Sequence, residues 1–361
     1  EYIATFDGGK QCVLKVADVQ TSIVTLSSRG CSQRDLIRSG MTLERSLLAP
    51  EKTPEQEKVG TSSPPLINQM SDLSFLPQAG AAVVDLSIGR SSTNETVNLG
   101  NATVFASTST ATSAQMFLFY GLTNDLAVGV QIDQTISDQS NYTYGPASSQ
   151  SGTRTTTTDL GLYDPILGFE YRALRQGVDP INAFVGLTVQ PSVIDAKSAT
   201  TTSNGTNGSG GHSAIISGRL VYEGAHIGSQ LSSAFMFRDK RTRTDATTGT
   251  STETTGGDTL SISGVFQAKL SRLFALNFGA GWHALGALES KTATNPNTVV
   301  SAFSYTKFGI GARATLVPDR FMLLVDIETT GGANSKAKSN GIEYDDALSQ
   351  NTLKLGGRFA F

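Results

Sequence analysis

The chain has 361 residues, of which 16% are charged, 38% are hydrophobic and 37 are glycine, with a formal net charge of −3. Globular proteins usually carry about a quarter charged and nearly half apolar residues, so this chain is low in both. The near-neutral balance excludes the basic face of a nucleic-acid-binding protein. No apolar run approaches the roughly 18 residues of a transmembrane helix. This composition favours an all-β structure whose two faces meet different solvents.

Residues 1–48 are predicted to form a small separate region. Tyr2–Phe6 and Cys12–Val16 flank an Asp-Gly-Gly sequence, which is a hairpin signal. Ser32–Leu48 has a helix-like spacing of apolar residues, interrupted by one glycine. Cys12 and Cys31 are separated by 18 residues and lack the C-x-x-C spacing. A disulfide in an oxidising compartment is therefore favoured over two unrelated buried thiols.

Residues 49–79 are predicted to be a linker that ends in a plug. Pro50, Pro54, Pro64 and Pro65 lie among Glu and Lys, as in an extended spacer. Leu66–Leu76 is more apolar and lies directly before the first alternating segment. This segment is well placed to enter the lumen of a barrel from below.

From Gly80 onward, hydrophobicity alternates with a period of two. In the last segment Leu353 and Leu355 fall on one face, while Lys354 and Arg358 fall on the other. Short turns alternate with long polar loops at residues 138–155, 198–212, 239–257, 291–297 and 331–346. The sequence therefore predicts a transmembrane antiparallel up-and-down β-barrel of about 12 strands over residues 80–361, rather than a soluble sandwich.

The face opposite the apolar one is predicted to line the lumen, and it carries charges of both signs. The candidates are Asp133, Glu170, Arg172, Arg219, Glu223, Arg238, Lys269, His283, Lys307, Arg313, Asp326, Glu328, Lys354 and Arg358. About eight strands already reach the width that side chains fill, so a wider lumen must hold water, a plug or both. The charges fit either a conduction path of weak ion selectivity or pairs that brace the wall.

The chain ends on an alternating strand that carries Phe359 and Phe361. These aromatic residues are the predicted signal for the barrel-assembly machinery. The outward face predicts contact with outer-membrane lipid and lipopolysaccharide, and a homotrimer is left open. The expected location is the bacterial outer membrane, with the N-terminal region in the periplasm and no nucleic acid as a partner.

The three histidines do not indicate an enzyme. His212 lies in a Gly/Ser loop, while His226 and His283 are predicted to face the lumen. None has the spacing of a metal site, and no Ser–His pair is predicted on the outward face. We therefore predict no catalytic residues, no metal and no cofactor.

Three short motifs resemble those of a known family. Tyr120–Val130 resembles a “YGLTDRLELGV” turn, and Asp159–Leu162 followed by Ile166–Arg172 resembles “GDLxLGLKYR”. Phe75–Gly80 looks like the “LPKG” that opens a first strand, with one extra residue before the glycine. Over residues 75–361 the chain thus resembles the outer-membrane family labelled “MetA-pathway of phenol degradation” and its transporter-like relatives. It is also similar to the trimeric pore that exports functional-amyloid subunits.

The resemblance implies a barrel of about 12 strands that acts as a passive channel for small, aromatic or hydrophobic solutes. It further implies gating or plugging by the N-terminal region, which here has a cysteine pair instead of a clear heptad repeat. Two alternatives stay open at this point. One is an export pore for an amyloid-type polypeptide, and the other is a structural or adhesion barrel that binds a partner through its long loops.

Overall fold

The structure is a computed structural model that describes residues 2–5, 11–20, 23–29, 43–45, 70–146, 148, 152–157, 161–198, 206–245, 249–292, 295–339 and 341–361. The chain divides into two compact units, Glu1–Leu66 and Ile67–Phe361. Within these ranges no helix could span a membrane.

The N-terminal unit contains a four-stranded antiparallel sheet in the order β3-β2-β1-β4. Its strands are β1 (Tyr2–Thr5), β2 (Gln11–Gln20), β3 (Ile23–Arg29) and β4 (Leu43–Arg45). The expected hairpin is β1–β2, whereas Leu43–Arg45 pairs with β1 instead of forming a helix. Pairing with a sheet edge prevails there because a short helix is only marginally stable alone. Cys31 and the side chain of Cys12 lie outside the described residues, so the disulfide stays a prediction.

The second unit is a closed barrel of 12 antiparallel strands, which confirms the predicted fold. The barrel strands are β5 (Ala82–Leu99), β6 (Ala102–Gly121), β7 (Leu126–Tyr144), β10 (Ile166–Leu174), β11 (Asn182–Gln190), β13 (Ser213–Glu223), β14 (Ile227–Arg238), β17 (Thr259–Lys269), β18 (Phe274–Leu285), β21 (Phe303–Val317), β22 (Phe321–Ser339) and β23 (Ile342–Ala360). The barrel closes where β23 pairs with β5. Closure removes the free strand edges that could not be tolerated in lipid.

The period of two decides which face each side chain takes. Large apolar residues such as Leu353, Leu355 and Trp282 are exposed on the outside. Their strand neighbours, such as Lys354 and His283, line cavities inside the barrel. The result is an apolar outer wall around a polar interior, as a membrane barrel requires.

The two ends of the barrel differ. The turns that follow β6, β10, β13, β17 and β21 are short, and both ends of the barrel sequence lie beside them. There Phe361 N donates to Ala82 O at 2.8 Å, and Ala82 N donates to Phe361 O at 3.2 Å. We call this the short-turn end and the opposite one the long-loop end.

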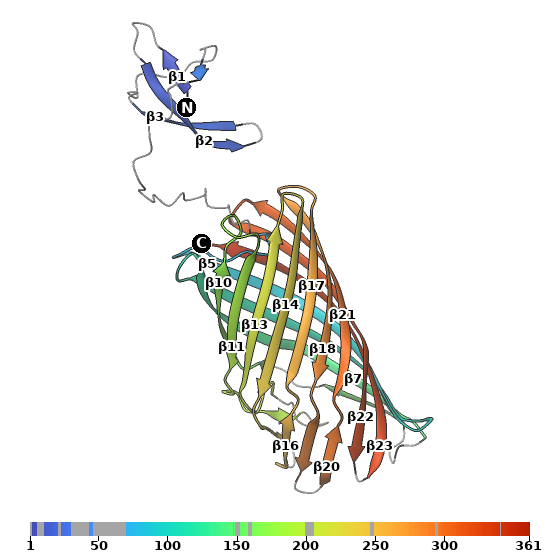
Figure 1. Cartoon of the computed structure of the whole chain (residues 1–361). Coiled ribbons are helices and arrows are strands. Elements are labelled where there is room, and N and C mark those ends of the chain that lie inside the picture. Colours follow the sequence, from blue (N-terminus) through green and yellow to red (C-terminus); the bar gives the residue numbers. More distant parts are fainter. Residues whose placement is uncertain are drawn as a thin grey trace. The chain divides into compact units, whose positions relative to one another are not determined.

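Four of the five predicted long loops were predicted wrongly, because much of their described length is strand. In the fifth, residues 198–212, the only strand residue in the described part is Ser198 at its start. The connections between barrel strands at the long-loop end contain β8 (Thr153–Thr157), β9 (Gly161–Leu162), β12 (Lys197–Ser198), β15 (Arg241–Asp245), β16 (Ser251–Gly256), β19 (Leu288–Thr292) and β20 (Asn295–Val300). In addition, β5, β6, β7, β22 and β23 have 18 to 20 residues each, and Figure 1 shows β22 and β23 reaching well past β11. About 9–11 residues suffice to cross a membrane. The threonines of these segments favour strands, but both faces are polar, so no alternation marks them.

A buried carboxylate ties the long-loop end together. Asp164, which precedes β10, is 1% exposed. Its Oδ1 accepts hydrogen bonds from the backbone of Val193 and Ile194, both at 2.7 Å. Its Oδ2 accepts from the backbone and hydroxyl of Ser209, at 2.6 and 2.7 Å. Burial raises the pKa of this carboxyl, but the hydrogen bonds outweigh that effect and hold the pKa below its usual value of 3.8.

Candidate functional site: a plugged lumen

Residues Met70–Gln78, here called the plug segment, lie inside the barrel at the short-turn end. Met70 is 4% exposed and Leu76 is 1% exposed. Leu76 packs in an apolar cluster with Ala127, Phe184 and Val221, which come from β7, β11 and β13. The plug segment is thus buried against inward-facing side chains on several strands.

The barrel wall satisfies the backbone of the plug segment. Four carbonyls of the plug segment accept hydrogen bonds from lumenal side chains: Met70 O from Arg358 (3.0 Å), Ser71 O from Gln267 (2.8 Å), Leu73 O from Arg219, and Ser74 O from Arg172 (2.9 Å). The donors stand on four different strands, β23, β17, β13 and β10. Backbone groups without a sheet partner need such donors when they are removed from water. The lumen is therefore built to hold this segment.

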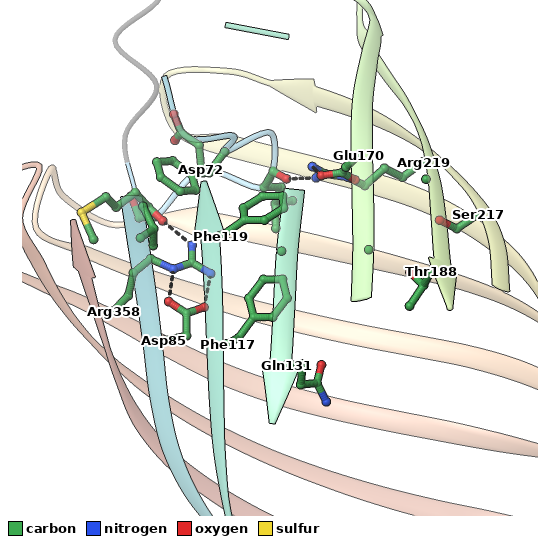
Figure 2. A pocket seen from close by; sticks show the side chains of 18 of the residues that line it. Asp72, Asp85, Phe117, Phe119, Gln131, Glu170, Thr188, Ser217, Arg219 and Arg358 are labelled. Carbon is green, nitrogen blue, oxygen red and sulfur yellow. Dashed lines mark hydrogen bonds and ion pairs between the residues drawn. The ribbon is translucent and has the colours of Figure 1, made fainter. Parts of the chain in front are cut away.

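Two of these arginines are themselves held by carboxylates. Arg219 binds Glu170 through two hydrogen bonds of 2.6 and 2.8 Å, and its guanidinium lies 3.8 Å from the centre of the Phe184 ring. Arg358 binds Asp85 through two hydrogen bonds of 2.7 Å. Figure 2 shows both pairs beside the plug segment. Paired contacts of this kind fix the guanidinium plane and aim the remaining N–H groups at the plug segment.

A lysine links the plug segment directly to the wall. Lys269 Nζ lies 2.8 Å from Asp72 Oδ1 in the plug segment and 2.6 Å from Glu223 Oε2 on β13. Glu223 Oε1 also accepts a hydrogen bond from Ser74 N at 2.9 Å. The three charged side chains are each less than 15% exposed. Lys269 therefore separates two carboxylates that would otherwise face each other.

The plug segment leaves the lumen along the turn between β6 and β7. Gly80 N donates to Gly121 O at 2.8 Å, and Ala79 N donates to Asn124 Oδ1 at 3.1 Å. A Cβ on Gly121 would lie 2.0 Å from Gln78 O and 2.6 Å from Pro77 O. Only glycine allows this close approach of two backbones.

We expect Gly121→Ala to displace the exit of the plug segment. The added methyl group must push the carbonyls of Pro77 and Gln78 away, at a cost of about 1–3 kcal/mol. The temperature at which the folded barrel loses its gel mobility should fall, and single-channel conductance in bilayers should rise. Gly331→Ala is the matched control, because a Cβ there has no neighbour within 4 Å. Equal behaviour of the two variants would contradict the role of this contact.

Three cavities lie along the lumen. The inner chamber, of about 470 Å³, adjoins the plug segment and includes Phe117, Phe119 and Met322. The middle chamber, of about 410 Å³, is polar and lies between β5–β7 and β22–β23. The outer chamber, of about 490 Å³, lies toward the long-loop end and is lined from β13 through β23. The lumen is therefore partly open above the plug segment.

The fourteen predicted lumenal residues fall into four groups. Arg172, Glu223 and Lys269 contact the plug segment. Glu170, Arg219, Arg313 and Arg358 line the inner chamber, and Arg219 and Arg358 also bind the plug segment. Asp133, Asp326, Glu328 and Lys354 line the middle chamber, where Asp326 pairs with Arg313 at 2.8 Å. Arg238, His283 and Lys307 line the outer chamber.

Other predicted residues are placed as follows. Phe359 stacks on Phe321 with ring centres 4.6 Å apart, and Phe361 is 79% exposed at the short-turn end.

His226 was predicted wrongly to face the lumen. It lies exposed in the turn between β13 and β14, because β13 ends at Glu223 and β14 begins at Ile227. His212 Nδ1 accepts a hydrogen bond from Ser192 N at 2.9 Å.

Several site residues were missed at the sequence level. Asp72 and Asp85 bind lumenal cations, and Gln267 is fully buried between Ser71 and Asn277. No pattern marks them, because a single polar residue is ordinary both on an inward strand face and in a segment outside the strands. Phe117 and Phe119 did carry a signal. They belong to the apolar run 116–120, whose inward members must also be apolar.

The three motifs that carry the family resemblance meet around the plug segment. Phe75–Gly80 is the exit of that segment, and Tyr120–Val130 contains the turn that receives it. The third motif supplies Glu170 and Arg172, and Arg172 N also donates to Asp125 O in the turn at 2.7 Å. Segments far apart in sequence thus build one structure at the short-turn end.

Comparison with solved structures places the fold among known barrels. The chain is similar to an outer membrane channel from Pseudomonas putida F1, with a TM-score of 0.50 and 14% identity over 78% of this chain and 96% of that chain. It is also similar to the transport unit of the autotransporter AIDA-I from Escherichia coli (TM-score 0.47, 10% identity, 80% of this chain and 93% of that chain). A FadL homologue from Pseudomonas aeruginosa gives a TM-score of 0.42 at 8% identity, covering 77% of this chain and 90% of that chain. No family model and no curated protein matches the sequence.

Proposed function

We propose that the protein is an outer-membrane channel for small solutes that is closed at rest by the plug segment. The observation that carries this proposal is the set of lumenal side chains that bind the backbone of residues 70–74. A barrel with only a structural role needs no side chains that bind a segment in its lumen. A gated pore needs a plug that is bound at rest and can be released. The cavities above the plug segment supply the remaining path.

The proposed orientation follows from the two ends of the barrel. Short turns face the periplasm in bacterial outer-membrane barrels, and the long connections face outward. We therefore place the short-turn end and the N-terminal unit on the periplasmic side. The exposed apolar wall would contact lipid and lipopolysaccharide, and the strand ending in Phe359 and Phe361 would be read by the assembly machinery.

The inner chamber supports aromatic or hydrophobic solutes. Phe117 and Phe119 face it with ring centres 5.3 Å apart, and Met322 adds a polarisable side chain. Its charged groups are paired, as Arg219 with Glu170 and Arg358 with Asp85. A solute without net charge would pass such a surface without breaking an ion pair.

Two deletions test the proposed function. Removing residues 1–65 leaves the plug segment in place, and single-channel conductance should stay at the low level of the full chain. Removing residues 1–78 takes the plug segment away, so conductance and liposome swelling with small sugars should rise together. Unchanged conductance after the longer deletion, in a barrel that still shows folded gel mobility, would refute plugging.

A further inference from the structure

The outer chamber differs from the other two cavities in its charge. In the inner chamber the lining arginines Arg219, Arg313 and Arg358 each lie within 2.8 Å of a carboxylate. The middle chamber has three carboxylates and one lysine, Lys354, among its lining residues. The outer chamber instead has two cations, Arg238 and Lys307, and one carboxylate, Asp346.

Neither side chain, Arg238 or Lys307, forms an ion pair with a carboxylate among the described residues. The carboxylate of Asp258 lies near Arg238, but it accepts a hydrogen bond from the backbone N at 2.9 Å and none from the guanidinium. The guanidinium of Arg238 donates to Gly257 O and to Thr259 Oγ1 (2.6 Å), which are both neutral groups. Lys307 forms no ion pair or hydrogen bond with the residues that the structure describes. A partly buried cation whose charged group is not paired directly still attracts an anion beside it.

The same cavity has an aromatic wall. His283 on β18 stacks on Tyr305 of the neighbouring β21, with ring centres 4.9 Å apart and planes 13° from parallel. Phe303 extends this wall, with its ring centre 6.3 Å from that of Tyr305. Apolar side chains such as Ile215, Met236 and Leu348 also line the chamber. Stacked rings offer a further ring their faces and edges, which is favourable beyond simple area burial.

From this pairing of features we propose that the outer chamber is a binding site for small aromatic carboxylates. The ring of the ligand would lie against His283, Tyr305 and Phe303, and its carboxylate would be bound by Lys307 and Arg238. Pockets of this kind are mostly apolar, with a few polar groups that fix the orientation of the ligand. The inference deepens the proposed channel function, since it names a solute class that would be collected at the long-loop end before passage.

Calorimetric titration of the full-length protein in detergent tests the site, with sodium benzoate as the probe. We expect benzoate to bind. Benzyl alcohol, which keeps the ring but lacks the charge, and hexanoate, which keeps the charge but lacks the ring, should each bind about tenfold more weakly, the loss of one well-formed contact. Comparable binding of all three probes, or no binding of benzoate, would overturn the proposal.

Matched variants locate the binding. Lys307→Met should lower benzoate affinity about tenfold, as one charge-assisted contact is lost. It should not affect folding, because Lys307 has no partner in the described part of the chain. His283→Ala should lower the affinity of benzoate more than that of hexanoate. Lys354→Met, in the middle chamber, should leave binding unchanged; equal losses in Lys307→Met and Lys354→Met would overturn the assignment.

Binding and conduction can fail separately. Benzoate binding with no conductance change after deletion of residues 1–78 would retain the site and reject the plugged channel. Increased conductance after deletion, without benzoate binding to the full-length protein, would retain the channel and reject the site.

Discussion

Replacing Lys269 with methionine is expected to open the barrel. In the unmodified chain the carboxylates of Asp72 and Glu223 both lie within 2.8 Å of Lys269 Nζ. The substitution removes the charge between them and leaves the two carboxylates facing each other. Removing one member of a buried ion cluster costs about 3–5 kcal/mol, which would shift the plug equilibrium at least about 100-fold toward the displaced state. Single-channel conductance should therefore approach that of the deletion lacking residues 1–78.

Two companion variants show whether repulsion is the cause. The double variant Lys269→Met/Glu223→Gln removes one of the two negative charges, so conductance should return toward the low level of the unmodified chain. Lys240→Met is the matched control, since Lys240 pairs with Glu253 at 2.9 Å while both side chains are about half exposed. Exposed pairs contribute little, so this control should leave conductance unchanged. A closed Lys269→Met barrel would show that the lysine is not what holds the plug segment.

Replacing Asp164 with asparagine is expected to loosen the long-loop end. Its carboxylate accepts four hydrogen bonds from three residues, whereas an amide NH₂ cannot accept from the two donors of Ser209. Hydrogen bonds to charged groups contribute about 1.5–3 kcal/mol each, so local opening should increase about tenfold or more. Trypsin cleavage after Lys197 in reconstituted protein should accelerate accordingly.

The control for this variant lies on the same connection. Asp195→Asn changes an 83% exposed carboxylate whose partner, Lys197, lies 3.6 Å away. We expect no change in cleavage for that variant. Slow cleavage of Asp164→Asn, equal to that of the unmodified chain, would show that other contacts hold these loops.

In the unmodified chain, protonation of Asp164 at low pH should loosen the long-loop end as the Asp164→Asn substitution does at neutral pH. The pKa of the folded carboxyl lies below its usual 3.8, so the ionised form stabilises the folded loops above that pH. The contribution is lost as the pH falls from about 4 through the lowered pKa. Pepsin digestion of the long-loop end, followed from pH 4 downward, should accelerate in the unmodified chain but remain fast throughout in Asp164→Asn.

The barrel wall could be predicted because it depends on a local rule. In Leu353 to Arg358 every second residue is apolar, and an alternating strand has only one way to face lipid and water at once. The same rule places Glu170 and Arg219 inside and Phe235 outside without reference to any other part of the chain. It fails where both faces meet water, so the strands within residues 239–257 were taken for loops.

The plug contacts could not be predicted in the same way. Alternation predicts that Arg358 points inward. It does not predict that Arg358 contacts Met70, which is 288 residues away in the chain. Apolar character suggested a plug near Leu66–Leu76, and the part from Met70 onward does lie in the lumen. Its binding partners follow from the order in which the strands close the barrel.

Hydrophobic patterning was enough to predict a membrane barrel, the period of its strands and the inward face of its lumenal charges, because these follow from solvent preferences along a single strand. Which of these charges contact one another depends on the folded barrel. Closing twelve strands into a ring brings Lys269 to Asp72, ties the connection between β11 and β13 to Asp164, and leaves Lys307 beside an aromatic wall without a direct carboxylate partner among the described residues. Such pairings depend on strand order and register, which hydrophobic patterning does not encode.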